Sequence, residues 1–314
     1  MIARNRGGWT ASARERLDVV RGVLHGLRPY WPLTLRQVYY QLVAREVIAN
    51  RRAEYQALSR LLVKARLDGE VPWEALEDRV REHLGSAGWA DADDFIAEQG
   101  ERLLVGYRRD LLAGQDLALE VWIEKDALSR ICHDVAFGYC VPVVVARGFS
   151  SVSFLHECRR RVERAVLDEG KKGLRILYFG DLDPSGWAML PAMLRTLQEE
   201  MRLGELLVDG ERIALTPEQV EKHRLPHSVE AMKATDTRTP AYRDWLRSDG
   251  HPDTLAVELD ALSPEVLQGL VRDAIETSLD MERVERERAA EAGDVEAIRV
   301  LKAKVDRALK RGPR

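Results

Sequence analysis

Acidic side chains follow two apolar runs of this chain, in positions that suit a hard divalent cation. The run 174–179 is followed by Asp181 and Asp183, and the run 117–123 is followed by Glu124. Both runs have the composition of buried strands. In open α/β sheets, ligands bind at the edge formed by the carboxyl ends of the strands. Because carboxylate oxygens suit Mg²⁺ and phosphate chemistry, we predict one cation site at this edge.

The spacing of these acids supports a shared site. Asp181 and Asp183 are two positions apart, so both side chains point to one face if the strand geometry continues. Pro184 restricts Asp183 to extended backbone conformations. Three clustered carboxylates repel one another, and each would resist ionisation unless a cation compensated. A lone Asp-x-Asp is more often a solvated turn, so the pairing with Glu124 carries this prediction.

The amino-acid composition predicts a globular protein without a membrane-spanning segment. The chain has 314 residues, 45% hydrophobic and 32% charged, which is enough for two domains. It contains no run of about 20 apolar residues and does not begin like a signal peptide, so we expect a cytoplasmic protein. Cys132, Cys140 and Cys158 lack metal or redox spacing, and we expect buried free thiols.

Charge is distributed unevenly along the chain. The net charge is −4, yet residues 1–66 hold 13 Lys and Arg against 4 Asp and Glu. A basic N-terminal module would attract phosphate, while the acidic remainder would bind metal. The alternative is that Arg is merely abundant in this composition.

The N-terminal part has the apolar spacing of several helices. We predict helices at 10–28, from Thr34, at 52–67 and, shorter, at 74–82. Thr34 and Gln37 have the form of a capping box. Three helices with a basic surface suit a helix-turn-helix or winged-helix module, assigned here to residues 1–88.

The rest of the chain alternates between strand and helix patterns. A connection, 89–116, leads into a predicted α/β domain, 117–280, and a charged helical tail, 281–314. Strands are predicted at 117–123, 141–146, 174–179 and 255–259, with helices at 127–137, 152–166 and 187–201. This order predicts a parallel, Rossmann-like sheet with helices on both faces.

Three segments together resemble a Toprim domain, the module shared by topoisomerases, primases and some nucleases. They are 121–128, 145–149 and 180–186, the last reading Gly-Asp-Leu-Asp-Pro-Ser-Gly. With Glu124, the Asp-x-Asp-Pro-x-Gly pattern is most similar to the topoisomerase VI A subunit and its relative, the meiotic double-strand-break transesterase. The chain looks like a reduced, stand-alone relative of bacterial or phage type. It carries no ATPase module, which in that enzyme belongs to a separate B subunit and would be a further partner.

This resemblance implies roles for individual residues. Glu124, Asp181 and Asp183 would hold Mg²⁺, with Mn²⁺ as an alternative ion. Lys125 and Arg147 would lie near the scissile phosphate.

In that family a winged-helix domain carries a nucleophilic tyrosine four residues after an arginine, which matches Arg36 and Tyr40. The helix pattern places Tyr39 in the apolar stripe that faces the core. Tyr40 lies about 100° around the helix, on the side of Arg36, so we expect it to be exposed. The cation would favour the phenolate of a group that ordinarily titrates near ~10. The alternative is an ordinary boundary tyrosine.

These features predict Mg²⁺-dependent cleavage of double-stranded DNA by tyrosine transesterification, as in a type IIB topoisomerase A subunit. The family resemblance also implies a homodimer, in which the tyrosine of one subunit works with the metal site of the other. Two alternatives stay open: a Toprim hydrolytic nuclease used in defence or plasmid clearance, and a non-catalytic DNA-binding module.

A second acidic pair follows the run 255–259. Glu258 and Asp260 would either extend the metal site or cap a helix that begins near Ser263, and we favour capping or positioning.

Overall fold

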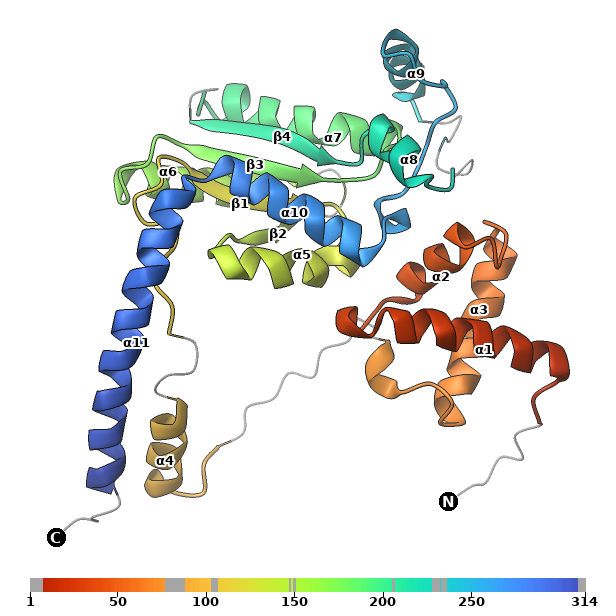
Figure 1. Cartoon of the computed structure of the whole chain (residues 1–314). Helices are drawn as coiled ribbons and strands as arrows, with labels where there is room; N and C mark the ends of the chain where they lie inside the picture. Colours follow the sequence, from red (N-terminus) through yellow and green to blue (C-terminus); the bar gives the residue numbers. More distant parts are fainter. Residues whose placement is uncertain are drawn as a thin grey trace.

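The computed structural model combines a helical portion with a small parallel sheet of four strands, compatible with an α/β domain (Figure 1). It describes residues 8–76, 88–102, 107–146, 148, 151–204, 207–227, 232 and 236–309.

The helical portion consists of α1 (Ala11–Gly26), α2 (Leu35–Ala44) and α3 (Arg52–Leu67), as the apolar spacing predicted. The Thr10 side chain caps α1, and Thr34 with Gln37 forms the predicted capping box of α2. Short 3-10 turns follow α1 (Arg28–Tyr30) and α3 (Trp73–Ala75). The remainder of the predicted helix 74–82 lies outside the described residues.

The sheet contains β1 (Ala118–Ile123), β2 (Val143–Val145), β3 (Leu174–Phe179) and β4 (Val208–Ala214). All neighbours are parallel, in the order β2-β1-β3-β4, and Ile123 at the end of β1 is level with Phe179 at the end of β3. The residues after β1 and β3 therefore meet at one edge. The predicted strand at 255–259 is wrong, because this segment makes a single antiparallel bridge, Leu182 with Val257. The strand β4 was not predicted.

Helices cover both faces of the sheet, as predicted (Figure 1). Side chains alternate along β1, so Val121 packs with α5 (Ser129–Ala136) and α10 (Pro264–Ser278), whereas Trp122 packs with α6 (Val152–Leu167) and α7 (Pro184–Arg195). Short helical turns flank α5 (Asp126–Leu128 and Phe137–Tyr139), and a π-helical turn extends α7 (Thr196–Glu200).

The remaining elements surround this core. Two short helices follow β4: α8 (Pro217–His223) and α9 (Thr239–Ser248). The connection contains α4 (Ala92–Arg102), which lies beside the long tail helix α11 (Met281–Leu309) in Figure 1. In the described part of the chain, no helix is long and apolar enough to cross a membrane.

The helical portion docks on the sheet portion through η7 (Leu259–Ala261), a 3-10 turn that contacts α2. One hydrophobic core runs from α1, α2 and α3 into the face covered by α5 and α10. This docking brings α2 to the carboxyl edge of the sheet.

Candidate functional site

Glu124 and Asp181 meet where β1 and β3 end. The Glu124 backbone amide donates to the carbonyl of Phe179 (2.9 Å), which continues the β1–β3 pairing one residue beyond the strands. The Glu124 carboxylate in turn accepts from the Asp181 backbone amide through Oε2 (3.0 Å). The Tyr178 hydroxyl donates to the same oxygen (3.4 Å). The register of β1 against β3 therefore fixes the position of the Glu124 carboxylate.

Asp183 begins α7. Its backbone is extended, and Oδ1 accepts from the Gly186 amide (2.6 Å) as the helix N-cap. Gly186 is required here by space, because a Cβ atom would lie 2.3 Å from the carbonyl oxygen of Asp181. The turn that carries both aspartates is thus closed by a residue without a side chain.

Arg212 of β4 stabilises this turn through hydrogen bonds to its backbone. Its guanidinium donates to the carbonyl oxygens of Gly180 (3.3 Å) and Asp181 (3.2 Å), and also to that of Gly186. Burial lowers the pKa of Arg212 from its ordinary value. These carbonyl contacts position the two aspartates, so we regard Arg212 as a positioning residue.

Burial raises the pKa values of Glu124 and Asp183. Burial first, and the neighbouring Asp181 carboxylate second, raise the pKa of Glu124 to about 7. Burial also raises the pKa of Asp183, against the hydrogen bond from Gly186. A divalent cation would relieve this repulsion and stabilise the ionised forms.

The ammonium group of Lys125 contacts three carboxylates. Its ammonium nitrogen is 2.9 Å from Oδ1 of Asp181, 2.8 Å from Oδ2 of Asp260 and 3.0 Å from Oε2 of Glu258. Burial alone would lower the pKa of Lys125, but Asp260 and Asp181 outweigh burial and raise it. Lys125 therefore stays charged and neutralises part of the acidic edge.

Arg36 joins the same cluster from the helical portion. Its guanidinium pairs with Glu258, and its Nε atom lies 3.2 Å from Oδ2 of the fully buried Asp260. Glu258 and Asp260 were expected to cap the next helix or to position other groups. The capping is wrong, because Ser263 itself caps α10 by accepting from the Val266 amide (3.3 Å), whereas the two acids hold Arg36 and Lys125.

Tyr40 borders this cluster but is buried. The Arg36 guanidinium carbon lies 5.9 Å from the centre of the Tyr40 ring, so the two are neighbours as expected. The expected exposure of Tyr40 is wrong, since only 4% of the residue is accessible. Burial raises the pKa of Tyr40, although Arg36 and Lys125 act to lower it. The expected phenolate is therefore disfavoured in this arrangement.

The burial of Tyr40 has a structural cause. Its ring packs edge-on against Tyr39, with centres 5.2 Å apart, and the two belong to one core. The Tyr39 ring meets Tyr55 of α3, and its hydroxyl donates to Oδ1 of Asn50 (3.0 Å) just before that helix. The other side of α2 is covered by η7. This helix thus has two buried faces, not one.

The acids fit Mg²⁺ in their chemistry. Among the described residues, hydrogen bonds engage Oε2 of Glu124 and Oδ1 of Asp181 and leave the second oxygen of each carboxylate available. The carboxylates of these two residues and Asp183 are not all within 4.8 Å of one another. Within the described ranges, the set that meets this distance is Glu218, Asp249 and His251, which is largely exposed and joins α8 to the end of α9.

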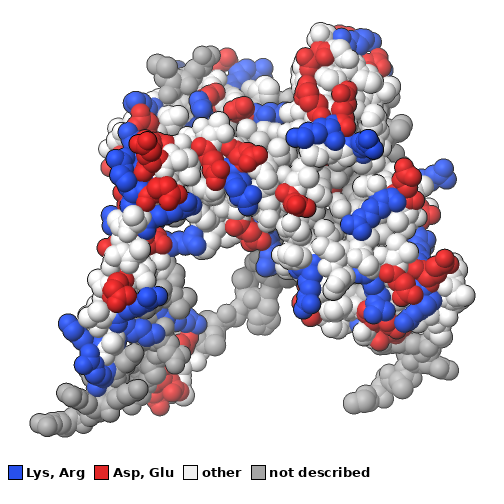
Figure 2. Space-filling model, in the orientation of Figure 1, with Lys and Arg blue, Asp and Glu red and all other residues white. Residues whose placement is uncertain are grey.

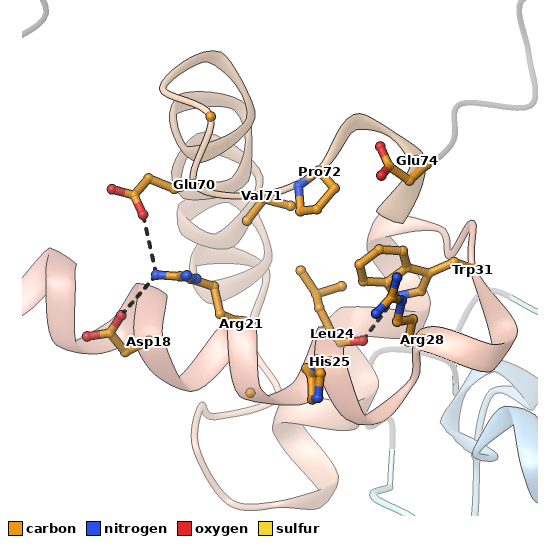
Figure 3. A pocket seen from close by; sticks show the side chains of 12 residues that line it. Asp18, Arg21, Leu24, His25, Arg28, Trp31, Glu70, Val71, Pro72 and Glu74 are labelled. Carbon is orange, nitrogen blue, oxygen red and sulfur yellow. Dashed lines mark hydrogen bonds and ion pairs between the residues drawn. The ribbon is translucent and has the colours of Figure 1, made fainter.

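A separate cavity of about 680 Å³ lies in the helical portion (Figure 3). It is lined by residues of α1, by Arg28 and Trp31, and by residues 69–72 and Glu74, and so shares no residue with the carboxyl edge. Arg21 on its wall is paired with Asp18 (3.7 Å) and Glu70 (3.3 Å). The positive charge of Arg21 is thus partly neutralised by acidic residues of the same wall.

The structure brings together most of the residues singled out from sequence, namely Arg36, Tyr40, Glu124, Lys125, Asp181 and Asp183. Arg147 lies outside the described residues. The sequence analysis did not identify the positioning role of Arg212 or the contact that Tyr178 makes with Glu124. It did single out Glu258 and Asp260, because both follow an apolar run with a spacing of two residues.

No protein-family model matches this chain, and none of the curated proteins searched is significantly similar to it.

Proposed function

We propose that this chain is a Mg²⁺-dependent DNA-cleaving enzyme similar to the topoisomerase VI A subunit, with a Toprim-like sheet portion and a winged-helix-like helical portion. The observation that carries the proposal is the docking of α2 on the carboxyl edge of the sheet. Arg36 on α2 pairs with Glu258 and Asp260, and Lys125 links the same pair to Asp181. A tyrosine, an arginine and the acids thus belong to one cluster.

In the proposed reaction the Tyr40 hydroxyl oxygen attacks a DNA phosphorus. A phosphotyrosyl bond forms, the phosphodiester bond to the leaving nucleoside breaks, and the proton that the phenol loses is balanced by the one that the leaving oxygen takes up. Mg²⁺ held by Glu124, Asp181 and Asp183 would stabilise charge on the phosphoryl oxygens. Arg36 has a planar guanidinium that suits two-point contact with phosphate.

Access to Tyr40 requires a change in α2. Because Tyr40 is buried and α2 contacts η7, we propose that DNA reaches its hydroxyl when the Arg36 ion pairs with Glu258 and Asp260 break. A homodimer in which α2 approaches the acids of a second subunit would supply such a change. Double-stranded DNA is the proposed substrate, and a separate ATPase subunit is a further proposed partner.

Charge on the visible face is mixed. Figure 2 shows positive and negative side chains interspersed over both portions. Part of the basic excess of the helical portion is neutralised locally, since Arg14 pairs with Glu70 and Arg16 pairs with Glu54. We therefore expect few phosphate contacts, and DNA binding that falls only gradually with salt.

A second candidate is hydrolytic cleavage by a Toprim-type nuclease. The burial of Tyr40 and its raised pKa favour this reading, because water would need no rearrangement of α2. The acids and Mg²⁺ would have the same role, and Tyr40 would be a packing residue.

The test is cleavage of supercoiled DNA with Mg²⁺ by the wild type, Tyr40→Phe and Asp181→Asn. Tyr39→Phe is the matched control, since its hydroxyl donates to Asn50 of the helical portion (3.0 Å). Transesterification predicts protein-linked DNA ends that only Tyr40→Phe and Asp181→Asn abolish. Protein-free ends with an active Tyr40→Phe would instead establish the hydrolase. Salt-sensitive binding with no cutting by the wild type would reject both and leave a DNA-binding module.

A further inference from the structure

A second cavity, of about 610 Å³, opens beside α7. Its wall combines one indole, two guanidinium groups and small side chains: Trp187, Ala188, Pro191, Ala192, Arg195, Thr237 and Arg238. The volume is in the range of pockets that bind small organic groups. Nothing in the proposed cleavage chemistry uses this cavity.

The cavity is next to the acidic edge. The Trp187 amide donates to the Asp183 carbonyl oxygen (2.9 Å), so the indole lies one helical turn beyond this candidate metal ligand. The separation of four residues between Asp183 and Trp187 corresponds to a rise of about 6 Å along the helix axis. The pKa of Arg238 is raised mainly by its hydrogen-bonded partner Asp236 and also by the charge of Asp183. The cavity is therefore within reach of a DNA strand bound at the acidic edge.

Trp187 is held in a fixed orientation. Its ring stacks on Trp245, with centres 5.8 Å apart and planes inclined by 29°. The ring of Tyr242 meets it edge-on at 5.9 Å, and the Tyr242 hydroxyl is anchored on the Leu255 carbonyl oxygen (3.0 Å). A partly exposed aromatic face fixed in this way suits stacking by a nucleobase, which needs no sequence-specific contact.

The polar groups of the wall suit the rest of a nucleotide. Arg195 is exposed in the last turn of α7, and no ion pair is formed by its guanidinium within the described ranges. Arg238 is fixed by two hydrogen bonds to Asp236 (2.8 and 2.9 Å). The Arg195 guanidinium could therefore bind the phosphate of a nucleotide whose base stacks on the Trp187 indole.

We propose that this cavity binds an unpaired nucleotide of the DNA substrate, with its base on Trp187 and its phosphate at Arg195. This inference rests on the proposed function, because it places the nucleotide next to the phosphodiester bond to be cleaved. The enzyme would then act preferentially on DNA that is melted, gapped or unstacked near the cleavage position, and the energy of stacking would hold the strand at the acidic edge.

The test measures binding in EDTA, so that it does not depend on cleavage. Fluorescently labelled single-stranded and fully paired oligonucleotides are titrated with the wild type, Trp187→Leu and Trp187→Phe. We expect Trp187→Leu to lose roughly tenfold in affinity for the single strand, and Trp187→Phe to retain most of it. Affinity for the paired duplex should stay unchanged. Equal affinity of the wild type and Trp187→Leu for the single strand would overturn the proposal.

A surface variant guards against a folding defect in Trp187→Leu. Arg195→Gln removes an exposed charge and should weaken single-strand binding with a smaller salt dependence, whereas the control Arg160→Gln on the exposed side of α6 should not. Identical binding by both arginine variants would contradict the phosphate position. If binding follows these expectations but no Mg²⁺-dependent cutting occurs, the proposed function fails while the nucleotide site stands.

Discussion

The ammonium nitrogen of Lys125 lies 2.9 Å from Oδ1 of Asp181, a residue proposed here as a Mg²⁺ ligand. The same nitrogen contacts Asp260 and Glu258, and Asp260 is fully buried. The chain thus supplies a positive charge of its own at the acidic edge. A metal ion that binds Asp181 must share this carboxylate with Lys125 or displace the ammonium from it.

Lys125→Met is therefore expected to destabilise the metal-free protein. Removing one partner of a buried ion pair leaves uncompensated charge, which costs about 3 kcal/mol or more. Mg²⁺ should raise the melting temperature of the variant more than that of the wild type, because the ion takes over the lost charge. The measurement is thermal unfolding with EDTA and with Mg²⁺.

Lys172→Met is the matched control for this experiment. Lys172 pairs with Asp116 (2.6 Å), but its side chain is 75% exposed. An exposed pair contributes between 0 and about 1 kcal/mol. If Lys125→Met were as stable as this control, or responded to Mg²⁺ like the wild type, the counter-ion role of Lys125 would be wrong.

Gly186→Ala should disrupt the turn that carries both aspartates. The added Cβ would meet the Asp181 carbonyl oxygen at 2.3 Å, and this oxygen also accepts from Arg212. Backbone must shift, which costs about 1–3 kcal/mol and should weaken Mg²⁺ binding. Denaturant unfolding and metal titration measure the two effects.

Gly269→Ala should stabilise the protein, in contrast to Gly186→Ala. Gly269 is within α10, and nothing lies within 4 Å of an added Cβ. Alanine should stabilise the helix by about 0.5–1 kcal/mol. Equal stability of the two glycine variants would show that space at Gly186 does not matter.

The elements with a regular apolar pattern were predictable from sequence. The helix 52–67 and the strand 174–179 have the bounds that the spacing predicted. In β4, by contrast, Asp209, Glu211 and Arg212 interrupt the apolar positions, because this strand lies at the sheet margin with one neighbour. The run 255–259 is apolar because it is buried, yet it pairs at one position only. An apolar run reports burial and does not specify a backbone partner.

Sequence also grouped the acids correctly at one sheet edge but could not foresee the environment of Tyr40. Helical periodicity assigned α2 one buried face, which Tyr39 occupies. The second face is buried by η7, a turn more than 200 residues later in the chain. No pattern within α2 encodes this contact. Arg212 was missed for a related reason: its carbonyl partners follow β3 and are hidden from any local pattern.

Glu124→Gln should make stability less dependent on pH. The folded-state pKa of Glu124 is about 7, above the ordinary 4.5, because burial and Asp181 disfavour its charge. Between these two values the unfolded chain has released the proton and the folded protein still binds it, so stability falls as pH rises. The glutamine variant lacks this loss and can still accept from the Asp181 amide.

The measurement is the midpoint of denaturant unfolding in EDTA from pH 4 to pH 8. Wild type and Glu124→Gln should be similar near pH 4, and the variant should be more stable by on the order of 1 kcal/mol or more above pH 7. A constant difference between the two proteins over this range would refute the role of Glu124 ionisation.

Thiol labelling should distinguish the three cysteines, which form no disulfide among the described residues; the expectation that all three are buried is wrong for Cys140. Cys158 is fully buried, and burial first and Glu120 second raise the pKa of its thiol to about 12. Because the thiolate is the reactive form, Cys158 should be nearly inert at pH 8. Cys132 is also fully buried, whereas Cys140 is partly exposed. Iodoacetamide should therefore modify Cys140 first in the native protein and all three in guanidinium chloride, as followed by peptide mass spectrometry. Modification of native Cys158 as fast as Cys140 would show that the α6 face of the sheet opens readily to solvent.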